Sequence, residues 1–251
     1  MIKVDCPGKR CRINVLPTRL GIVHVSANKN GHNTSPFPYG WVSLFVLLLV
    51  LFGSGCAKVP PDPELARIRH WQEFVKATRS ATTSEKLVSV NDYFNQLNYV
   101  EDQDLYGRDD YWATVRETLG RSSGDCEDFA IAKYFTLRDL DVPEENMRIT
   151  YVIPVQSRKP HMVLTYTFNA QEDPLVLDTM VKILLPVSRR SDLVPVYSFN
   201  LSGYWIARKD KKWRGERVGN AAQLSLWWSL LQRMVEEDAF SFRKPVSLAG
   251  G

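Results

Sequence analysis

Cysteine and long apolar runs are scarce in this chain of 251 residues. Four cysteines are too few for a disulfide framework at this length, and a single long apolar run excludes a polytopic membrane protein. The sequence has no paired CxxC, no glycine-rich phosphate loop and no internal repeat. Its 44% apolar and 24% charged residues suffice for one sizeable core and a small second one, which excludes a disordered or fibrous protein.

The net charge of +4 is concentrated in the first 56 residues. That segment carries six basic residues and one acidic residue, whereas the rest of the chain carries 26 basic and 27 acidic residues. A body with a net charge of −1 lacks the basic surface that is typical of nucleic-acid-binding proteins. We therefore expect no nucleic-acid partner.

Residues 41–52 form the apolar run, which follows a basic segment and precedes three small residues and Cys56. This order is typical of a secretory signal, although residues 37–55 are also long enough for a membrane anchor. The sequence before Cys56 resembles a lipoprotein cleavage box, with Gly53 where an aliphatic residue is usual, so lipid attachment to Cys56 is an alternative. We expect an amino-terminal extension with a signal or anchor (1–56), a proline-rich linker (57–63), one domain (64–240) and a disordered tail (241–251).

Within the domain, hydrophobic periodicity predicts helices followed by strands. Helical spacing extends over residues 65–75, over 87–97 after Ser84 as the expected cap, and later over 125–140 and 224–234. Residues 98–124 read as a polar loop with a short helical turn that ends at Gly120. From Met147 the spacing changes to two in the runs MRITYVIPV, HMVLTYTF, PLVLD, VPVYSF and YWIAR. The pattern predicts an α+β domain with an antiparallel sheet.

Cys126 is the cysteine inside this domain, and an unpaired thiol in an exported protein needs a reason. The run SSGDCEDFAIAKYF places it in the first turn of a helix, after a glycine that permits close approach of the chain. A helix amino terminus lowers a cysteine pKa from about 8.5 toward roughly 3.5–7.5. A small, buried and unreactive cysteine fits the same position. Its partners therefore decide between the two.

His161 opens one predicted strand, and Asp178 closes the next. In a hairpin that turns near residues 169–170, these two positions lie opposite one another. A carboxylate beside an imidazole fixes its tautomer and stabilises the imidazolium. Each residue alone fits a structural role, but together with a thiol at a helix start they indicate nucleophilic catalysis. His70 lies on an amphipathic helix, where we expect a structural role.

Several motifs in order resemble the bacterial transglutaminase-like cysteine proteinases over about residues 64–240. They are DYWAT (110–114), GDCEDFAIAKYFTL (124–137), HMVL (161–164), PLVLD (174–178) and PVYSFN (195–200). The resemblance implies a papain/transglutaminase-like fold in which the nucleophile begins a helix that packs on an antiparallel sheet. It implies Cys126 as nucleophile, His161 as general base and then acid, and Asp178 as the orienting carboxylate.

The resemblance also implies a periplasmic endopeptidase whose substrate is a large surface adhesin, so that cleavage controls biofilm release. The expected partner is an inner-membrane receptor that responds to cyclic di-GMP and sequesters the enzyme. Two alternatives stay open. The same triad serves transglutamination, and a calcium-dependent binding module with an inactive site is the non-enzymatic alternative.

The resemblance further implies Ca²⁺ bound by Asp125 and Glu127. An acid about 6 Å from a thiolate opposes it by about 2–3 kcal/mol at an effective dielectric of 20. Together with Asp128, these acids would suppress the nucleophile unless a cation compensates. The alternative is that acids in a first helical turn simply favour the dipole. Further ligands are sought among Asp102, Asp104, Asp109 and Asp110.

Trp112 precedes the nucleophile in the sequence, and its indole N–H could support an oxyanion beside the backbone N–H of Cys126. Core packing is the alternative that we favour. A basic cluster near the end of the sheet is expected to be a solvated hairpin loop rather than a binding patch; its residues are Arg208, Lys209, Lys211, Lys212, Arg214 and Arg217.

Overall fold

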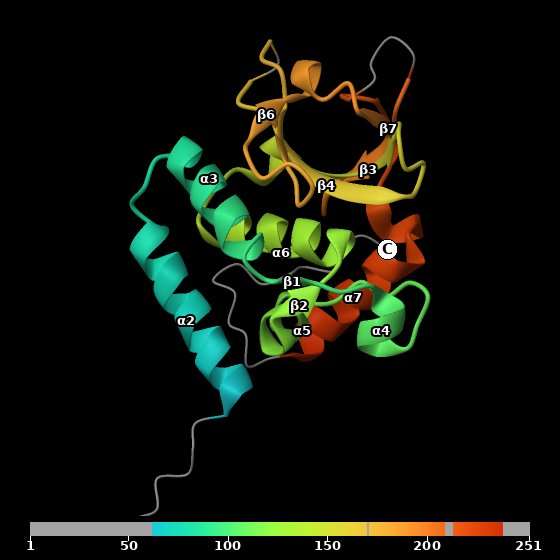
Figure 1. Cartoon of the computed structure of the whole chain (residues 1–251). Coiled ribbons are helices and arrows are strands. Elements are labelled where there is room, and N and C mark those ends of the chain that lie inside the picture. Colours follow the sequence, from blue (N-terminus) through green and yellow to red (C-terminus); the bar gives the residue numbers. More distant parts are fainter. Residues whose placement is uncertain (1–61, 170, 209–212, 238–251) are drawn as a thin grey trace, which may run out of the picture. The chain divides into compact units, whose positions relative to one another are not determined.

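The computed structural model describes residues 62–169, 171–208 and 213–237, which form a helical layer packed on a curved sheet (Figure 1). The expected leader with Cys56, most of the linker and the expected tail lie outside the described residues. Among the helices that are described, none has the length and apolar character needed to cross a membrane.

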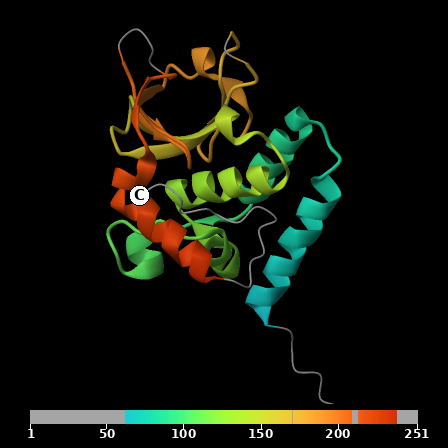
Figure 2. The same ribbon diagram turned by 180° about the vertical axis from the view of Figure 1, so that it is seen from behind.

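Most of the described α-helices precede the strands of the large sheet in the sequence, and one α-helix follows them. The helices are α2 (Pro63–Thr78), α3 (Thr83–Phe94), α4 (Asp102–Tyr106), α5 (Val115–Arg121), α6 (Cys126–Asp139) and α7 (Ser225–Glu236), with 3-10 turns η1 (Glu144–Asn146), η2 (Val187–Arg189) and η3 (Ala221–Gln223). Figure 2 shows the layer from behind, with α6 directly next to the sheet.

Two helix starts differ from the expectation, and a third helix was not expected. Helix α2 begins at Pro63, the last residue of the expected linker, because proline suits a first helical position where its missing N–H is not needed. Thr82 rather than Ser84 caps α3: its side chain and that of Glu85 each accept a backbone N–H from the other residue. Helix α4 lies in the segment that was expected to be a loop.

The predicted antiparallel sheet is confirmed. Its strands follow the order β6-β5-β4-β3-β7-β8-β9. Their bounds are β3 (Met147–Pro154), β4 (His161–Tyr166), β5 (Leu175–Leu177), β6 (Leu185–Pro186), β7 (Leu193–Phe199), β8 (Tyr204–Ile206) and β9 (Glu216–Gly219). In a separate parallel pair, β1 (Asn98–Tyr99) lies beside β2 (Ser123–Gly124), and β2 directly precedes the start of α6.

The main core lies between α6 and the sheet. All residues of α6 except Glu127 and Arg138 are buried, and the helix packs on β4 and β3. A smaller apolar cluster includes Val152, Val163 and Val176. Every residue of β4 is therefore buried, including His161 at the start of the strand.

The register of the β4–β5 hairpin differs from the expectation. Leu164 pairs with Leu177 and Tyr166 with Leu175, so His161 and Asp178 are not directly opposite. The turn is centred one residue later than predicted, because the side chain of Asn169 accepts the N–H groups of Gln171 and Glu172 and organises a longer connection. Since the displacement is two residues along the ladder, an even number, both side chains remain on one face of the sheet.

Candidate active site

Cys126 is the first residue of α6, as predicted, and it is almost fully buried. The predicted close approach at Gly124 is also confirmed, because a Cβ added there would lie 2.8 Å from the Cβ of Asp128. The carboxylate of Asp128 accepts the backbone N–H groups of Ala113 (2.7 Å) and Asp125 (3.4 Å). These contacts fix the start of the helix that presents the thiol.

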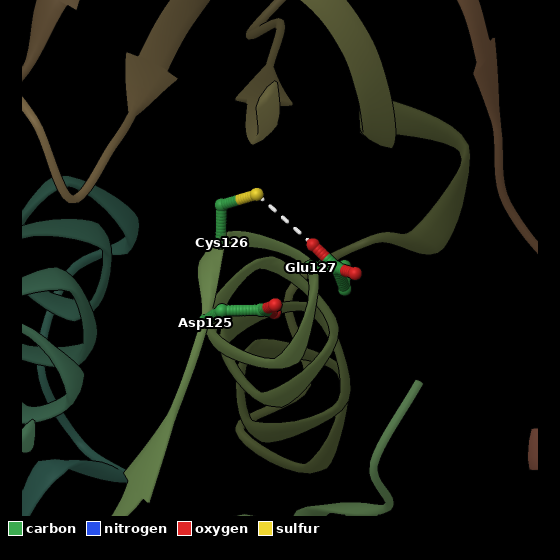
Figure 3. Close-up of side chains that lie close together, drawn as sticks. All are labelled: Asp125, Cys126 and Glu127. Carbon is green, nitrogen blue, oxygen red and sulfur yellow. Dashed lines mark hydrogen bonds between the residues drawn. The ribbon is translucent and has the colours of Figure 1, made fainter. Parts of the chain in front are cut away.

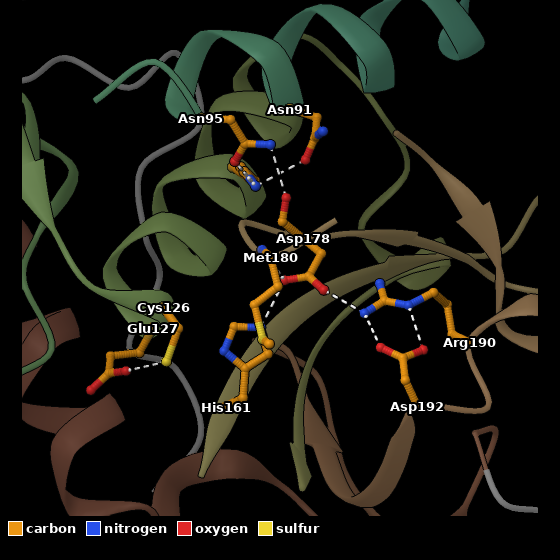
Figure 4. A network of polar contacts seen from close by, with 10 residues as sticks. Asn91, Asn95, Cys126, Glu127, His161, Asp178, Met180, Arg190 and Asp192 are labelled. Atoms are coloured by element: carbon orange, nitrogen blue, oxygen red, sulfur yellow. Dashed lines mark hydrogen bonds and ion pairs between the residues drawn. The ribbon is translucent and has the colours of Figure 1, made fainter. Parts of the chain in front are cut away.

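His161 and Asp178 form a buried hydrogen-bonded pair. The Nε2 atom of His161 lies 2.7 Å from Oδ1 of Asp178. Because a carboxylate accepts this bond, Nε2 carries the proton and Nδ1 is the free basic nitrogen. In Figure 4 the imidazole lies between Asp178 and Cys126, and both Cys126 and His161 line the same cavity. The structure thus pairs His161 with Asp178 and places His161 and Cys126 in the lining of one cavity.

Arg190 is a site residue that sequence reasoning missed. Its Nη2 atom donates to Oδ2 of Asp178 (2.7 Å), and its guanidinium also donates to both carboxylate oxygens of Asp192 (3.0 and 2.9 Å). Burial alone would raise the pKa of Asp178, but hydrogen bonds from His161 and Arg190 outweigh burial and lower that pKa to about 2. Arg190 follows a short 3-10 turn and belongs to no motif, so no sequence signal points to it.

Five acids next to the nucleophile form an acidic cluster: Asp102, Asp110, Asp125, Glu127 and Asp128. Ligand oxygens of Asp102, Asp110 and Glu127 lie within 4.8 Å of one another, as do those of Asp102, Asp125 and Asp128. Asp104 and Asp109, the other two candidate ligands, belong to no such group among the described residues. The structure therefore favours Asp102 and Asp110 as the additional acids.

The acidic cluster fits a hard cation. Buried oxygens of Asp102 and Asp125 have no hydrogen-bond partner among the described residues. Burial and the charges of Glu127 and Asp128 together raise the pKa of Asp125 to about 10, and burial is the main reason why the pKa of Asp102 is raised to about 6. A helix dipole does not explain unpaired oxygens on two separate elements. Carboxylates in this number suit calcium, which takes 6–8 oxygen ligands.

The thiol of Cys126 donates a hydrogen bond to Oε2 of Glu127 at 2.9 Å (Figure 3). Burial raises the pKa of Cys126 well above its ordinary value, and the charges of Glu127 and Asp125 raise it further. The expectation that the helix start lowers this pKa is therefore wrong for the protein without a cation. The predicted suppression by neighbouring acids is confirmed in direction.

The cavity that contains Cys126 and His161 has a volume of about 1070 Å³. Its lining is partly apolar and includes Trp112, Tyr151, Met162, Met180, Tyr197 and Leu226. Trp112 is buried and stacks on Phe199 at a centroid distance of 5.5 Å, which confirms the packing role. The Trp112 side chain also opposes the rise that burial causes in the pKa of Asp110.

Two further predicted features lie away from the cavity. His70 is at the surface, where Nδ1 lies 3.3 Å from the hydroxyl of Tyr93. The described part of the basic cluster belongs to the β8–β9 hairpin, and Arg208 pairs with Glu216 at 3.0 Å. Both observations agree with the structural roles expected for these residues.

Comparison with known proteins places the chain in a family. The profile described as bacterial transglutaminase-like cysteine proteinase BTLCP matches residues 62–208. A solved structure of Legionella pneumophila LapG is 36% identical, with a TM-score of 0.60, and the match covers 68% of this chain and 88% of that one. An EGTA-treated LapG (37%, 0.61) and a calcium-bound LapG (37%, 0.60) match over 68% of this chain and over 89% and 91% of theirs. No match was found among curated proteins.

Proposed function

The chain belongs to the bacterial transglutaminase-like cysteine proteinases and is a LapG-like cysteine protease, and on this basis we propose that it is a calcium-dependent endopeptidase with the triad Cys126, His161 and Asp178. The observation that carries the triad is the buried His161–Asp178 pair, 2.7 Å long, because His161 lines the same cavity as Cys126. Geometry of this kind orients an imidazole toward a nucleophile.

The reaction follows from the two nitrogens of His161. Nδ1 takes the proton from Sγ of Cys126 while the sulfur bonds to the scissile carbonyl carbon, and Asp178 stabilises the imidazolium through Nε2–H. The imidazolium then protonates the leaving amine as the carbon–nitrogen bond breaks, which leaves a thioester. His161 next removes a proton from water, whose oxygen attacks the thioester and releases the acid and the thiol.

The acidic cluster would hold the calcium. We propose Asp125 and Glu127 as ligands, with Asp102 and Asp110 as the nearest additional acids. When bound, the ion would supply positive charge that offsets the cluster beside Cys126 and so favours the thiolate. The unpaired oxygens of Asp102 and Asp125 and the calcium-bound state of the similar LapG support this proposal.

We further propose that the substrate is the amino-terminal region of a large cell-surface adhesin, that its cleavage releases biofilm, and that an inner-membrane cyclic di-GMP receptor sequesters the enzyme in the periplasm. The likeness to LapG supports this biology, and the apolar run at residues 41–52 supports export.

The direct test is incubation of the purified protein with the amino-terminal fragment of an adhesin encoded beside it, with calcium or with a chelator. We expect cleavage in calcium, none in the chelator, and none by Cys126→Ala. Mass spectrometry of the products identifies the new termini. Intact substrate in calcium contradicts the endopeptidase proposal.

Transglutamination is the enzymatic alternative, because an amine can resolve the thioester on Cys126 in place of water. Adding a labelled primary amine to the same reaction distinguishes the two, since incorporation without cleavage supports transfer. A binding module with an inactive site is the other alternative. Such a module would bind calcium and the fragment, yet a thiol-directed alkylating agent would not modify Cys126 at neutral pH.

A further inference from the structure

We propose that Arg190 is a positioning residue of this active site, which holds the carboxylate of Asp178 in the orientation that receives Nε2–H of His161. This inference rests on the proposed function, because it assigns Arg190 a part in the same triad. Arg190 acts through Asp178 and does not line the cavity.

The two oxygens of Asp178 have separate partners. Oδ1 accepts from Nε2 of His161 at 2.7 Å and from the backbone N–H of Met180 at 3.0 Å, whereas Oδ2 accepts from Nη2 of Arg190 at 2.7 Å. Rotation of the carboxylate about its last side-chain bond would break a contact on each oxygen. Arg190 therefore fixes the plane of the group that orients the imidazole.

Because the carboxylate of Asp178 is buried, the positive charge of Arg190 matters as well as the geometry of its guanidinium. Asp178 and Arg190 are each only 1% exposed. A buried carboxylate whose main partner is a neutral imidazole would favour its protonated form. A protonated carboxyl group accepts the Nε2–H hydrogen bond of His161 less strongly than a carboxylate does. The guanidinium supplies the compensating cation without entering the cavity.

Asp192 completes the arrangement on the outer side. It accepts two hydrogen bonds from Arg190, and its side chain is 47% exposed. A continuous series of contacts thus runs from His161 through Asp178 and Arg190 to Asp192 at the surface (Figure 4). The Nη1 atom of Arg190 has no partner among the described residues, so the two carboxylates hold the guanidinium.

The test compares Arg190→Met, Arg190→Lys and the neighbouring exposed control Arg189→Met in the calcium-loaded protein. We expect Arg190→Met to lower kcat about 10–100-fold with KM changed less than about threefold, as is typical when a partner behind a catalytic group is removed. Arg190→Lys should restore part of kcat, because lysine supplies the charge but not the planar fork. Arg189→Met should match the parent. Equal kcat for Arg190→Met and the parent would overturn the proposal.

A spectroscopic readout separates positioning from general stability. The imidazole N–H proton of His161 should give a downfield NMR signal in the parent, assigned by its loss in His161→Gln. In Arg190→Met that signal should move or disappear, while Arg189→Met keeps it. An unchanged signal in a folded Arg190→Met protein would contradict the positioning role. This measurement needs no substrate, so it stands even where the adhesin fragment is not cleaved.

A double-mutant comparison tests whether Arg190 acts through Asp178 or independently of it. If Arg190 acts through Asp178, adding Arg190→Met to Asp178→Asn should lower kcat less than about threefold further, whereas an independent role would multiply the two losses. If Arg190→Met does not fold, Asp192→Asn replaces it. We expect Asp192→Asn to lower kcat several-fold and to move the His161 signal, and no change in either would overturn the proposal.

Discussion

At the scale of single residues, the reactivity of Cys126 is set by its neighbours. The helix start favours a thiolate, but burial and two adjacent acids raise the pKa of the thiol, and the thiol donates to Glu127. The acids beside Cys126 therefore raise the pKa of its thiol and also offer oxygen ligands to a cation. Such a cation would favour the thiolate again. We therefore expect the activity of this site to depend on a metal ion.

The triad residues should behave as one unit. Cys126→Ala and His161→Ala should each lower the cleavage rate by several orders of magnitude, and Asp178→Ala by somewhat less, because an orienting carboxylate contributes less than a nucleophile. The fold should persist in Cys126→Ala and His161→Ala, as circular dichroism can check. Near-normal cleavage by Cys126→Ala would exclude a thiol nucleophile.

Replacing a single proposed calcium ligand should abolish calcium binding. We expect Asp125→Asn and Glu127→Gln to lose calcium binding and cleavage together, measured by calorimetric titration and by product formation. Asp104→Asn is the matched control, since Asp104 is exposed in the same acidic stretch and lies outside the cluster. Magnesium in excess should restore little activity because it requires a tighter octahedral shell. Full turnover in a strong chelator would contradict the calcium proposal and leave these acids with a helix-capping role.

At the scale of elements, the start of α6 depends on the absence of a side chain at Gly124. A Cβ there would lie 2.8 Å from Asp128, whose carboxylate holds the N–H groups of Ala113 and Asp125. Gly124→Ala should therefore cost about 1–3 kcal/mol in the free energy of unfolding and reduce cleavage. Gly219→Ala is the control, because no atom lies within 4 Å of its added Cβ, and its stability should change by no more than about 0.5 kcal/mol. Urea unfolding measures both.

The sequence predicts the long elements well because their periodicity extends over several turns or alternations. Helix α4 was missed because five residues are too few to display a period. The cap of α3 was misplaced by two residues, although Glu85 three positions after Thr82 is the capping-box spacing that identifies the correct one. The hairpin register was wrong because it depends on the turn around Asn169, and Arg190 was missed because its contact to Asp178 exists only in the folded chain.

At the scale of the whole molecule, the charge and hydropathy of residues 1–56 predict export. A reporter fused after Pro63 that is active only outside the cytoplasm should give signal, while one that is active only inside it should not. Metabolic labelling with a fatty acid, compared between the parent and Cys56→Ser, decides whether the amino terminus carries lipid. Activity of the cytoplasmic reporter would contradict export.

The buried Lys133 joins two helices of the helical layer, and its asparagine partners connect them to the segment after β5. Nζ of Lys133 on α6 donates to the amide oxygens of Asn91 (2.9 Å) and Asn95 (2.8 Å) on or next to α3. Asn95 in turn donates to the carbonyl of Asp178, and Asn91 to that of Lys182. The ammonium group thus supports the segment that carries Asp178.

This lysine should make stability depend on pH. Burial lowers the pKa of Lys133 to about 7, although the charge of Asp178 opposes the shift, whereas in the unfolded chain the pKa is about 10.4. Between these values the unfolded chain binds more protons than the folded one, so this group makes the free energy of unfolding rise with pH, by at most about 1.4 kcal/mol per unit. Urea unfolding of the parent and Lys133→Met at pH 6 to 10 should therefore show a difference, parent minus variant, that is flat below pH 7 and increases above it. Every other titrating group common to both proteins cancels in that difference, and a value that stays constant to pH 10 would mean that Lys133 remains charged in the fold.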